Sequence, residues 1–214
     1  MVPKLPYYYT SFLSIVKQYK VNSNMAVKKT TVFPDYVFET QIEVSPELNR
    51  QIQDSLKLNK DSGITTETVY GWFTNKQFPC EGVIGNIANL LATNFVSSVV
   101  QNFDLKVDRD INLLNPWIIS TNPNHSFPTT IEHQRWYNAG IYLQTTNKGS
   151  HLKLDNYTSK IYASQNTQET SHFIKPKQYK VIYWPSHIPW SLTPNMSMVE
   201  TTMLICSFRA DAQK

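Results

Sequence analysis

The sequence predicts a mainly β protein with two helices in its first half, built as a sandwich or jelly roll. Two observations predict this class. After residue 104, short apolar segments alternate with polar turns, as in a set of short antiparallel strands. Before that point, two segments repeat their apolar residues at helical spacing. We therefore expect both helices to pack on one face of the jelly roll.

The composition excludes several classes of protein. Of the 214 residues, 41% are hydrophobic, 13% aromatic and only 17% charged. A disordered chain would carry more charge and fewer aromatic residues. The net charge is +4, but the 20 Lys and Arg residues form no dense basic block, so we expect no specific nucleic-acid partner. No uninterrupted apolar run approaches the length of a membrane span, so no membrane contact is expected.

The first 24 residues differ from the rest of the chain. They show no amphipathic period, and they carry an unusual load of aromatic residues. We expect residues 1–24 to be an extension on a single domain formed by residues 25–214. The extension is either a mobile tail or an arm that docks on a partner, because Tyr supplies contact area at low entropic cost. The residues that would make this contact are Tyr7, Tyr8, Tyr9 and Phe12.

The domain begins with a strand and a helix. Residues 31–43 alternate and are rich in Val, Phe and Tyr, which predicts a strand broken at Pro34. Ser45 offers an N-cap, and a proline and an acid follow in the first turn. Leu and Ile residues then recur at i, i+4 and i+8, which predicts a helix over residues 46–58 with one apolar face. A second strand is expected within residues 64–73.

The second helix is the longest element that the sequence predicts. Apolar residues recur at helical spacing from residue 81 to residue 103, so we expect a helix that packs against the core. Short antiparallel strands should follow it. They are expected at 111–120, 136–146, 151–154, 160–163, 179–184 and 198–208.

The sequence contains few groups that could carry out chemistry. None of its five His residues stands in an H-x-D or H-x-E motif, the usual start of a metal site in a jelly roll. The six Gly residues form no phosphate-binding loop, and no Ser or Cys lies in a nucleophile motif. The two cysteines, Cys80 and Cys206, are expected to be reduced, with Cys206 packed in a strand.

Four short segments, taken in order, resemble one family of proteins. These segments are NPWI at 115–118, NAGIYL at 138–143, VIYWPSHIP at 181–189 and ICSF at 205–208. They are similar to segments of the 2-oxoglutarate/iron(II) oxygenases found in bacteria, marine phages and cyanobacteria. The resemblance implies a double-stranded β-helix, a jelly roll whose two sheets surround an iron site.

The same resemblance implies that the site residues are replaced. Thr130 and Glu132 stand at the two ligand positions of the first metal-binding segment, and Trp190 stands at that of the distal histidine. Met203 stands where a basic residue would pair with the cosubstrate. Thr is a poor ligand for iron(II) and Trp is none, while Met cannot form a charge-assisted pair. We therefore expect a degenerate member with no catalytic residues, no metal and no cofactor.

The leading hypothesis is a non-catalytic structural or assembly protein. Because relatives are frequent in marine phages, the specific expectation is a virion component in the neck or tail of a tailed phage. It would contact other virion proteins and form a homo-oligomeric ring. Its location would be the virion, or the bacterial cytoplasm during assembly.

Two alternatives remain open from the sequence. The first is an active iron(II)/2-oxoglutarate hydroxylase with an unusual ligand set: Glu132, His187 and either His133 or His125. The second is a carbohydrate-binding jelly roll that stacks sugars on an exposed Trp136 or Trp184.

Overall fold

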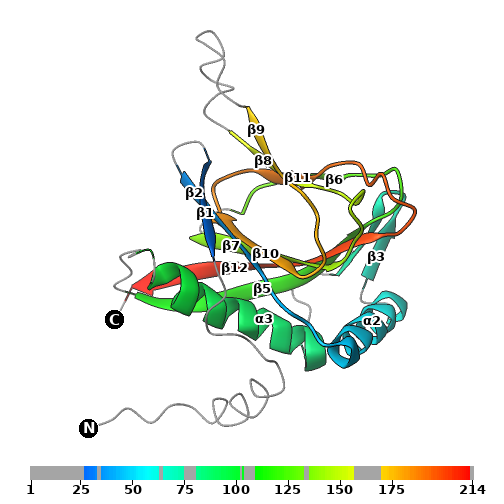
Figure 1. Ribbon diagram of the computed structural model, residues 1–214, viewed down its shortest axis with the longest axis horizontal. Coiled ribbons are helices and arrows are strands. Elements are labelled where there is room, and N and C mark those ends of the chain that lie inside the picture. The colour runs from blue at the N-terminus through cyan, green and yellow to red at the C-terminus, as the bar shows by residue number, and fades with distance from the viewer. Residues whose placement is uncertain are drawn as a thin grey trace.

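The structure, a computed structural model, consists of two antiparallel sheets and two helices (Figure 1). It describes residues 27–32, 35–62, 65–74, 81–101, 103, 109–132, 135–156 and 170–212. The helices are α2 (Pro46–Asp61) and α3 (Gly82–Asn94), and α3 continues as the π-helix η1 (Phe95–Val100). The strands of the first half are β1 (Lys28–Val32), β2 (Asp35–Gln41), β3 (Thr65–Thr68) and β4 (Gly71–Thr74). Those of the second half are β5 (Arg109–Thr121), β6 (Phe127–Thr130), β7 (Tyr137–Gln144), β8 (Leu152–Asp155), β9 (Ser171–Ile174), β10 (Lys180–Pro185), β11 (Trp190–Leu192) and β12 (Thr201–Ala212).

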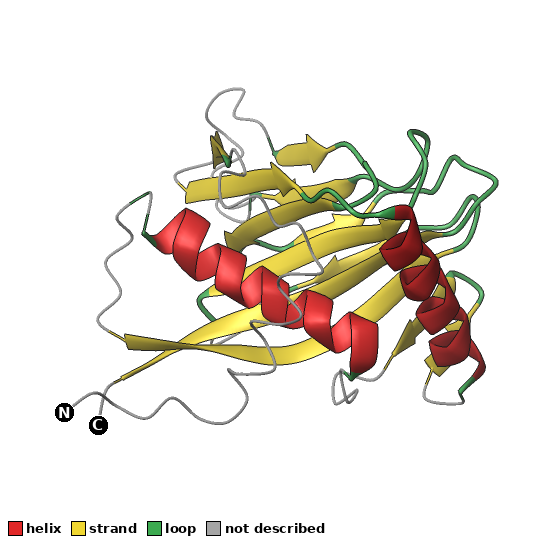
Figure 2. Cartoon of the chain, turned by 60° about the horizontal axis from the view of Figure 1, so that its bottom comes forward, coloured by secondary structure: helices red, strands yellow, loops and turns green. Residues whose placement is uncertain are grey.

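The two sheets face each other, and the helices cover the outer face of the larger one. The large sheet has eight strands in the order β1-β2-β10-β7-β12-β5-β4-β3, and the small sheet has four in the order β6-β11-β8-β9. Figure 2 shows α2 and α3 lying side by side across the large sheet. The predicted class, a mainly β jelly roll with two helices packed on one sheet, is confirmed.

Helix α2 forms where the sequence predicts it and ends three residues later than expected, at Asp61. The Ser45 hydroxyl accepts a hydrogen bond from the backbone N–H of Leu48 at 3.2 Å and so caps the first turn. Ile52 and Leu56 are buried on the face toward the sheet. The apolar stripe and the cap therefore act together, as the spacing predicts.

The second helix departs from the prediction in its last third. We expected one regular helix over residues 81–103, but the α-helical part ends at Asn94 and a π-helical stretch follows. The wider turn of the π-helix brings Phe95, Ser98 and Val99 to the sheet, where all three are buried. Phe95 stacks on Phe208 of β12 with ring centroids 4.6 Å apart. Tertiary packing thus decides the local geometry here.

The segment Gly82–Val100 is long and apolar enough, by length and composition alone, to span a membrane. Its Asn, Thr and Ser residues interrupt the apolar residues, so the segment was not predicted as a span from the sequence. In the structure the segment packs along the large sheet, where Ile84, Ile87 and Leu91 are buried. Core helices of globular proteins have the same composition.

Two predicted single strands are hairpins. The run over 31–43 folds back on itself, so that β1 pairs with β2 and Val32 lies opposite Asp35. The segment 64–73 likewise gives the hairpin of β3 and β4. Gly71 begins β4 with a φ of +144°, and a Cβ there would lie 1.9 Å from the carbonyl oxygen of Ser120. Only glycine lets β4 approach β5 this closely.

The large sheet separates two hydrophobic cores. The helix-side core lies between the sheet and the helices and includes Phe38, Leu91 and Phe95. The inner core lies between the two sheets and includes Trp184 and Trp190. Cys206 is buried in β12 on the helix side, as predicted, whereas Cys80, the predicted strand 160–163 and the arm 1–24 lie outside the described residues.

Candidate functional site

Large apolar side chains fill the space between the two sheets. Trp184, Trp190 and Met203 have no exposed surface there. Gly140 on β7 makes room for two of them, because a Cβ at Gly140 would come within 3.2 Å of both the Met203 methyl carbon and the Trp184 ring. The buried members of this inner core are Val32, Val37, Trp117, Ile119, Tyr142, Leu152, Leu154, Ile174, Ile182, Trp184, Ile188, Trp190, Leu192, Met203 and Ile205.

The structure brings together three of the four positions that the resemblance singled out. Trp190 on β11 lies directly opposite Thr130 on β6 in the small sheet, which makes them a cross-strand pair. Met203 on β12 of the large sheet belongs to the same inner core as Trp190. Glu132 follows β6 and is half-buried, in the loop beyond Thr130.

These residues do not fit iron(II) or 2-oxoglutarate. The indole of Trp190 offers no lone pair to a metal, and it is fully buried in the packed space between the sheets. Met203 gives a cosubstrate carboxylate no charge-assisted hydrogen bond. Within the described residues, no three His, Cys, Asp or Glu side chains lie close enough together to hold a metal ion.

The histidines of the alternative ligand set lie in different places. The imidazole of His187, in the exposed turn after β10, contacts the Asp35 carboxylate at 3.0 Å. The His125 ring, in the loop before β6, lies 2.9 Å from the Pro123 carbonyl oxygen and edge-on to Tyr70. His133 lies outside the described residues. The geometry therefore does not join His187 and His125 in one site.

Two buried polar atoms of the inner core have no hydrogen-bond partner among the described residues. The indole N–H groups of Trp184 and Trp190 are buried and have no acceptor among the described residues. Each such donor costs about 1–3 kcal/mol. Burying one Trp side chain stabilises by roughly 4–6 kcal/mol from its area alone, so packing outweighs this cost. The two rings also meet edge to face, with centroids 5.8 Å apart.

Tyr142 is the titratable member of the inner core, and its hydroxyl has a structural role. It donates a hydrogen bond to the Ser150 carbonyl oxygen at 3.1 Å and accepts one from the Leu152 N–H at 2.8 Å. Burial raises the pKa of Tyr142 well above its ordinary value, so the phenol stays neutral. This hydroxyl fixes the end of β7 to the start of β8.

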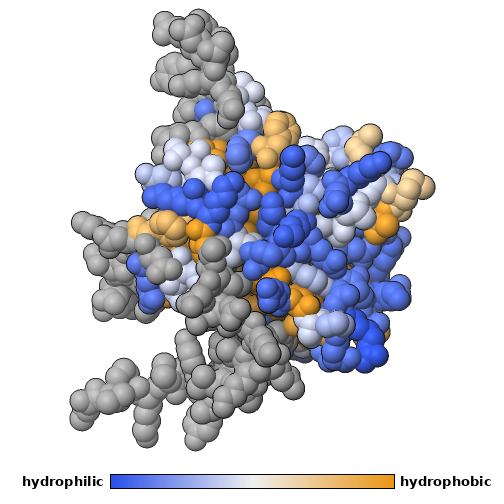
Figure 3. Space-filling model, in the orientation of Figure 1, coloured by the Kyte–Doolittle hydropathy of each residue, from blue (hydrophilic) through white to orange (hydrophobic). Residues whose placement is uncertain are grey.

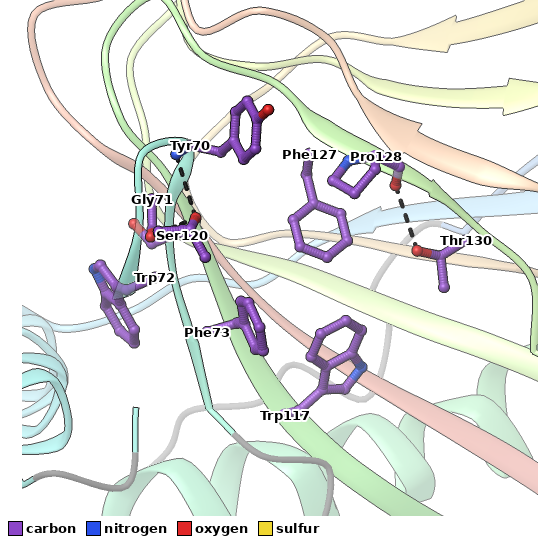
Figure 4. Close-up of a pocket in the computed structure, with 10 residues that line it drawn as sticks. Tyr70, Gly71, Trp72, Phe73, Trp117, Ser120, Phe127, Pro128 and Thr130 are labelled. Atoms are coloured by element: carbon purple, nitrogen blue, oxygen red, sulfur yellow. Dashed lines mark hydrogen bonds between the residues drawn. The ribbon is translucent and has the colours of Figure 1, made fainter. Parts of the chain in front are cut away.

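The inner core opens at one end into an aromatic pocket of about 360 Å³ (Figure 4). Phe73, Trp117 and Phe127 form its walls, with Tyr70 and Thr130 at its edges. Its full lining is Thr68, Tyr70, Gly71, Trp72, Phe73, Trp117, Ser120, Phe127, Pro128 and Thr130, a set without a charged side chain. We call this space the aromatic pocket. Sequence reasoning missed it because its walls come from the β3–β4 hairpin, β5 and β6.

The aromatic pocket is continuous with the packed interior. The Phe127 ring stacks on Trp190 with centroids 5.7 Å apart and an interplanar angle of 11°. Trp117 meets both Phe127 and Trp190 edge to face, at 5.7 and 6.3 Å. Phe73 meets Trp117 in the same way at 6.4 Å. The buried indole of Trp190 therefore supports the pocket from behind.

A half-buried carboxylate holds the strands beside the pocket in place. Glu200 accepts hydrogen bonds from Lys60 Nζ at 2.7 Å, Trp72 Nε1 at 3.0 Å and Ser120 Oγ at 3.2 Å. Burial alone would raise the pKa of Glu200, but the hydrogen bonds from Lys60 and Trp72 outweigh it and the pKa is lowered. This carboxylate links α2, β4 and β5 to the start of β12.

The carbohydrate hypothesis needed an exposed ring at Trp136 or Trp184. Trp184 is completely buried. Trp136 is half-buried, and its ring packs edge to face against Phe95 and Tyr137. Trp184 therefore offers no face to a sugar, and Trp136 is only partly accessible.

Known structures share this fold, although no protein-family model and no curated protein matches the sequence. A Pseudomonas putida prolyl-4-hydroxylase has a TM-score of 0.54 and 12% identity, over 94% of this chain and 99% of that chain. The α-ketoglutarate-dependent carbocyclase SnoK from nogalamycin biosynthesis has a TM-score of 0.61 and 6% identity, over 80% of this chain and 78% of that chain. HygX from Streptomyces hygroscopicus, solved with nickel and 2-oxoglutarate, has a TM-score of 0.55 and 7% identity, over 80% of this chain and 82% of that chain. The chain therefore has the fold of the 2-oxoglutarate/iron(II) oxygenases, the family that its sequence resembles.

Proposed function

We propose that this chain is a non-catalytic assembly protein built on an oxygenase-type jelly roll. The observation that carries the proposal is the packed inner core. Trp190 and Met203 fill the volume between the sheets at the positions where the resemblance expects a metal ligand and a cosubstrate partner. A fold keeps its chemistry only where the site residues remain.

An exposed apolar surface supports a role in protein contacts. Two loops at one end of the molecule carry it, the β3–β4 turn and the segment between β11 and β12. They are linked through the β5–β6 loop, because Asn122 N–H donates to the Tyr70 carbonyl and Asn124 N–H donates to that of Asn195. The exposed residues are Val69, Tyr70, Met196, Met198 and Val199. Apolar side chains gathered at one end are typical of an interaction surface.

The more specific proposal is a virion component in the neck or tail of a tailed phage. It is supported by the resemblance of the sequence to proteins frequent in marine phages. Copies of the chain would contact one another in a ring, together with other virion proteins. The protein would then be found in the virion, and in the bacterial cytoplasm while particles assemble.

The test uses purified particles of the phage or host that encodes the chain. Quantitative mass spectrometry of these particles should detect the protein at a fixed, multi-copy ratio to the major capsid protein. Light scattering of the purified chain should show an oligomer at micromolar concentration. Absence from the particles, together with a monomer at every concentration, would reject the proposed function.

A further inference from the structure

We propose that the aromatic pocket receives the N-terminal arm of a second copy of this chain, through residues 3–9. This inference rests on the assembly function proposed above and names the surface and the segment that would make the contact. Four steps lead to it: the chemistry of the pocket, the chemistry of the arm, the charges near both, and their positions on the large sheet.

The aromatic pocket is suited to a segment that presents apolar and aromatic side chains. Its walls are aromatic, and hydroxyl groups of Thr68, Ser120 and Thr130 lie among the lining residues. Its volume of about 360 Å³ is within the range of specific ligand sites. Tyr70 keeps about half of its surface exposed at the edge, so a ligand would cover it on binding. Grooves of this composition bind proline-rich segments.

The arm carries such a segment. Residues 3–9 read PKLPYYY, a Pro-x-x-Pro spacing followed by three tyrosines. Proline-rich segments of this kind lose little conformational entropy when they bind in aromatic-lined grooves. Tyrosine adds large contact area with few rotatable bonds. The arm therefore offers prolines and aromatic rings, the chemistry that an aromatic-lined pocket binds.

Charges near the pocket and near the arm are complementary. Lys4 is the charged side chain of residues 3–9, and Glu67 on β3 is exposed next to Thr68 of the pocket lining. The same pairing of signs occurs on the sheet edges, since β1 carries Lys29, which lies over the Tyr36 ring, while β3 carries Glu67. A head-to-tail approach of two copies would bring opposite charges together.

The sheet order allows a second copy, placed head to tail, to supply the arm. In the sequence the arm precedes β1, which forms one edge of the large sheet, and β3 forms the opposite edge (Figure 1). Residues of the β3–β4 hairpin line the pocket. Across eight strands these edges are on the order of 30 Å apart. A neighbour placed head to tail presents its pocket near the origin of the arm. Such a heterologous contact can close into a ring.

Photo-crosslinking of the full-length chain tests the contact. The photoreactive residue p-benzoylphenylalanine replaces Tyr8, and equal amounts of ¹⁴N- and ¹⁵N-labelled protein are mixed, equilibrated and irradiated. We expect mass spectrometry to find crosslinks from position 8 to peptides that contain Phe73 or Phe127. About half of them should join a light chain to a heavy chain, since only contacts between copies mix the isotopes.

A matched control places the same photoreactive residue at Phe173. This side chain is exposed on β9 of the small sheet and does not line the pocket. It should give no crosslinks to the Phe73 or Phe127 peptides. Tyr70→Ser on the accepting chain should lower the mixed-isotope yield about tenfold, as expected when one aromatic contact of an interface is lost.

Two outcomes would overturn the inference. One is a set of crosslinks to the pocket that joins only chains of the same isotope, which would mean that the arm folds back on its own chain. The other is an oligomer in which position 8 crosslinks elsewhere or not at all. In that second case the assembly function would survive and only the pocket–arm contact would fail, whereas a monomer that is absent from particles would reject both.

Discussion

The two ends of the space between the sheets differ in how they are filled. At one end, Trp184 and Met203 close over Gly140 and leave no exposed surface. At the other end, Phe73 and Phe127 border an open pocket of about 360 Å³ (Figure 4). The first end is packed hydrophobic core, while the second has an accessible cavity whose lining carries no charged side chain. The comparison teaches that one jelly roll can have a densely packed interior and an open cavity at one end of the same space.

Exposed apolar residues are few on the surface of the molecule. Figure 3 shows that polar residues cover most of the visible face, with apolar patches confined to a few places. Met198, in the loop between β11 and β12, is 90% exposed, whereas Met203, five residues later in β12, is fully buried. The exposed apolar residues at the pocket end are therefore available for a contact that the buried ones cannot make.

The largest effect is expected in the packed inner core, at Trp190. Trp190→Ala removes an indole that stacks on Phe127 and packs against Trp117 and Trp184, and it leaves a cavity. We expect the free energy of unfolding to fall by about 3–5 kcal/mol, measured by urea denaturation. A substitution that left stability unchanged, or raised it, would mean that the site is held under strain for a function rather than packed for stability.

A milder change at the same residue sharpens the comparison. Trp190→Phe keeps an aromatic ring but removes the buried N–H that has no acceptor among the described residues. Because the lost packing is partly offset by the removal of this donor, we expect a cost of about 1 kcal/mol in the same assay. A loss as large as that of Trp190→Ala would show that the N–H has a partner and contributes to stability.

The carboxylate beside the pocket should contribute less than Trp190. Glu200→Gln weakens the hydrogen bonds from Lys60 and Trp72, and partial exposure limits the cost to about 1 kcal/mol. Since the folded-state pKa of Glu200 lies below the ordinary value of 4.5, its contribution is present above about pH 4.5 and is lost as the pH falls through the folded-state pKa. Urea denaturation of both proteins at pH 7 and pH 3 tests this. The difference between them should shrink at pH 3, and a difference that grew would contradict the assignment.

The smallest effect on stability is expected at the open end. Tyr70 lies in the turn of the β3–β4 hairpin with about half of its surface exposed. Tyr70→Ser should change the free energy of unfolding by less than about 0.5 kcal/mol. The same variant should weaken self-association, which analytical ultracentrifugation measures over a concentration series. A large loss of stability with unchanged association would reverse the roles that we give to the two ends.

The sequence was sufficient for the class of the fold and for its helices. The cap at Ser45 and the spacing of apolar residues involve residues that are close in sequence, so both can be recognised without knowing the tertiary structure. The β3–β4 hairpin was missed, because its turn at Gly71 depends on the approach of β5, which is distant in sequence. The π-helical end of the second helix was missed for the same reason, since packing against Phe208 decides its geometry.

Some residues of the candidate site could be named from the sequence, and the aromatic pocket could not. The resemblance to a family singled out Thr130 and Trp190, and the structure pairs them across β6 and β11. The strands β6, β9 and β11 are only three or four residues long and were not predicted as elements. The aromatic pocket depends on β6 and on the unpredicted hairpin, so no local pattern could indicate it.

The most direct test of the packed interior is thermal melting of the purified chain with iron(II) and 2-oxoglutarate under anaerobic conditions. We predict an unchanged midpoint at millimolar concentrations of both. A ligand present at a hundred times its Kd would add about 2.7 kcal/mol of stability and raise the midpoint of a chain of this size by about 5–10 °C. A saturable shift of that size, at one metal ion per chain, would contradict the account.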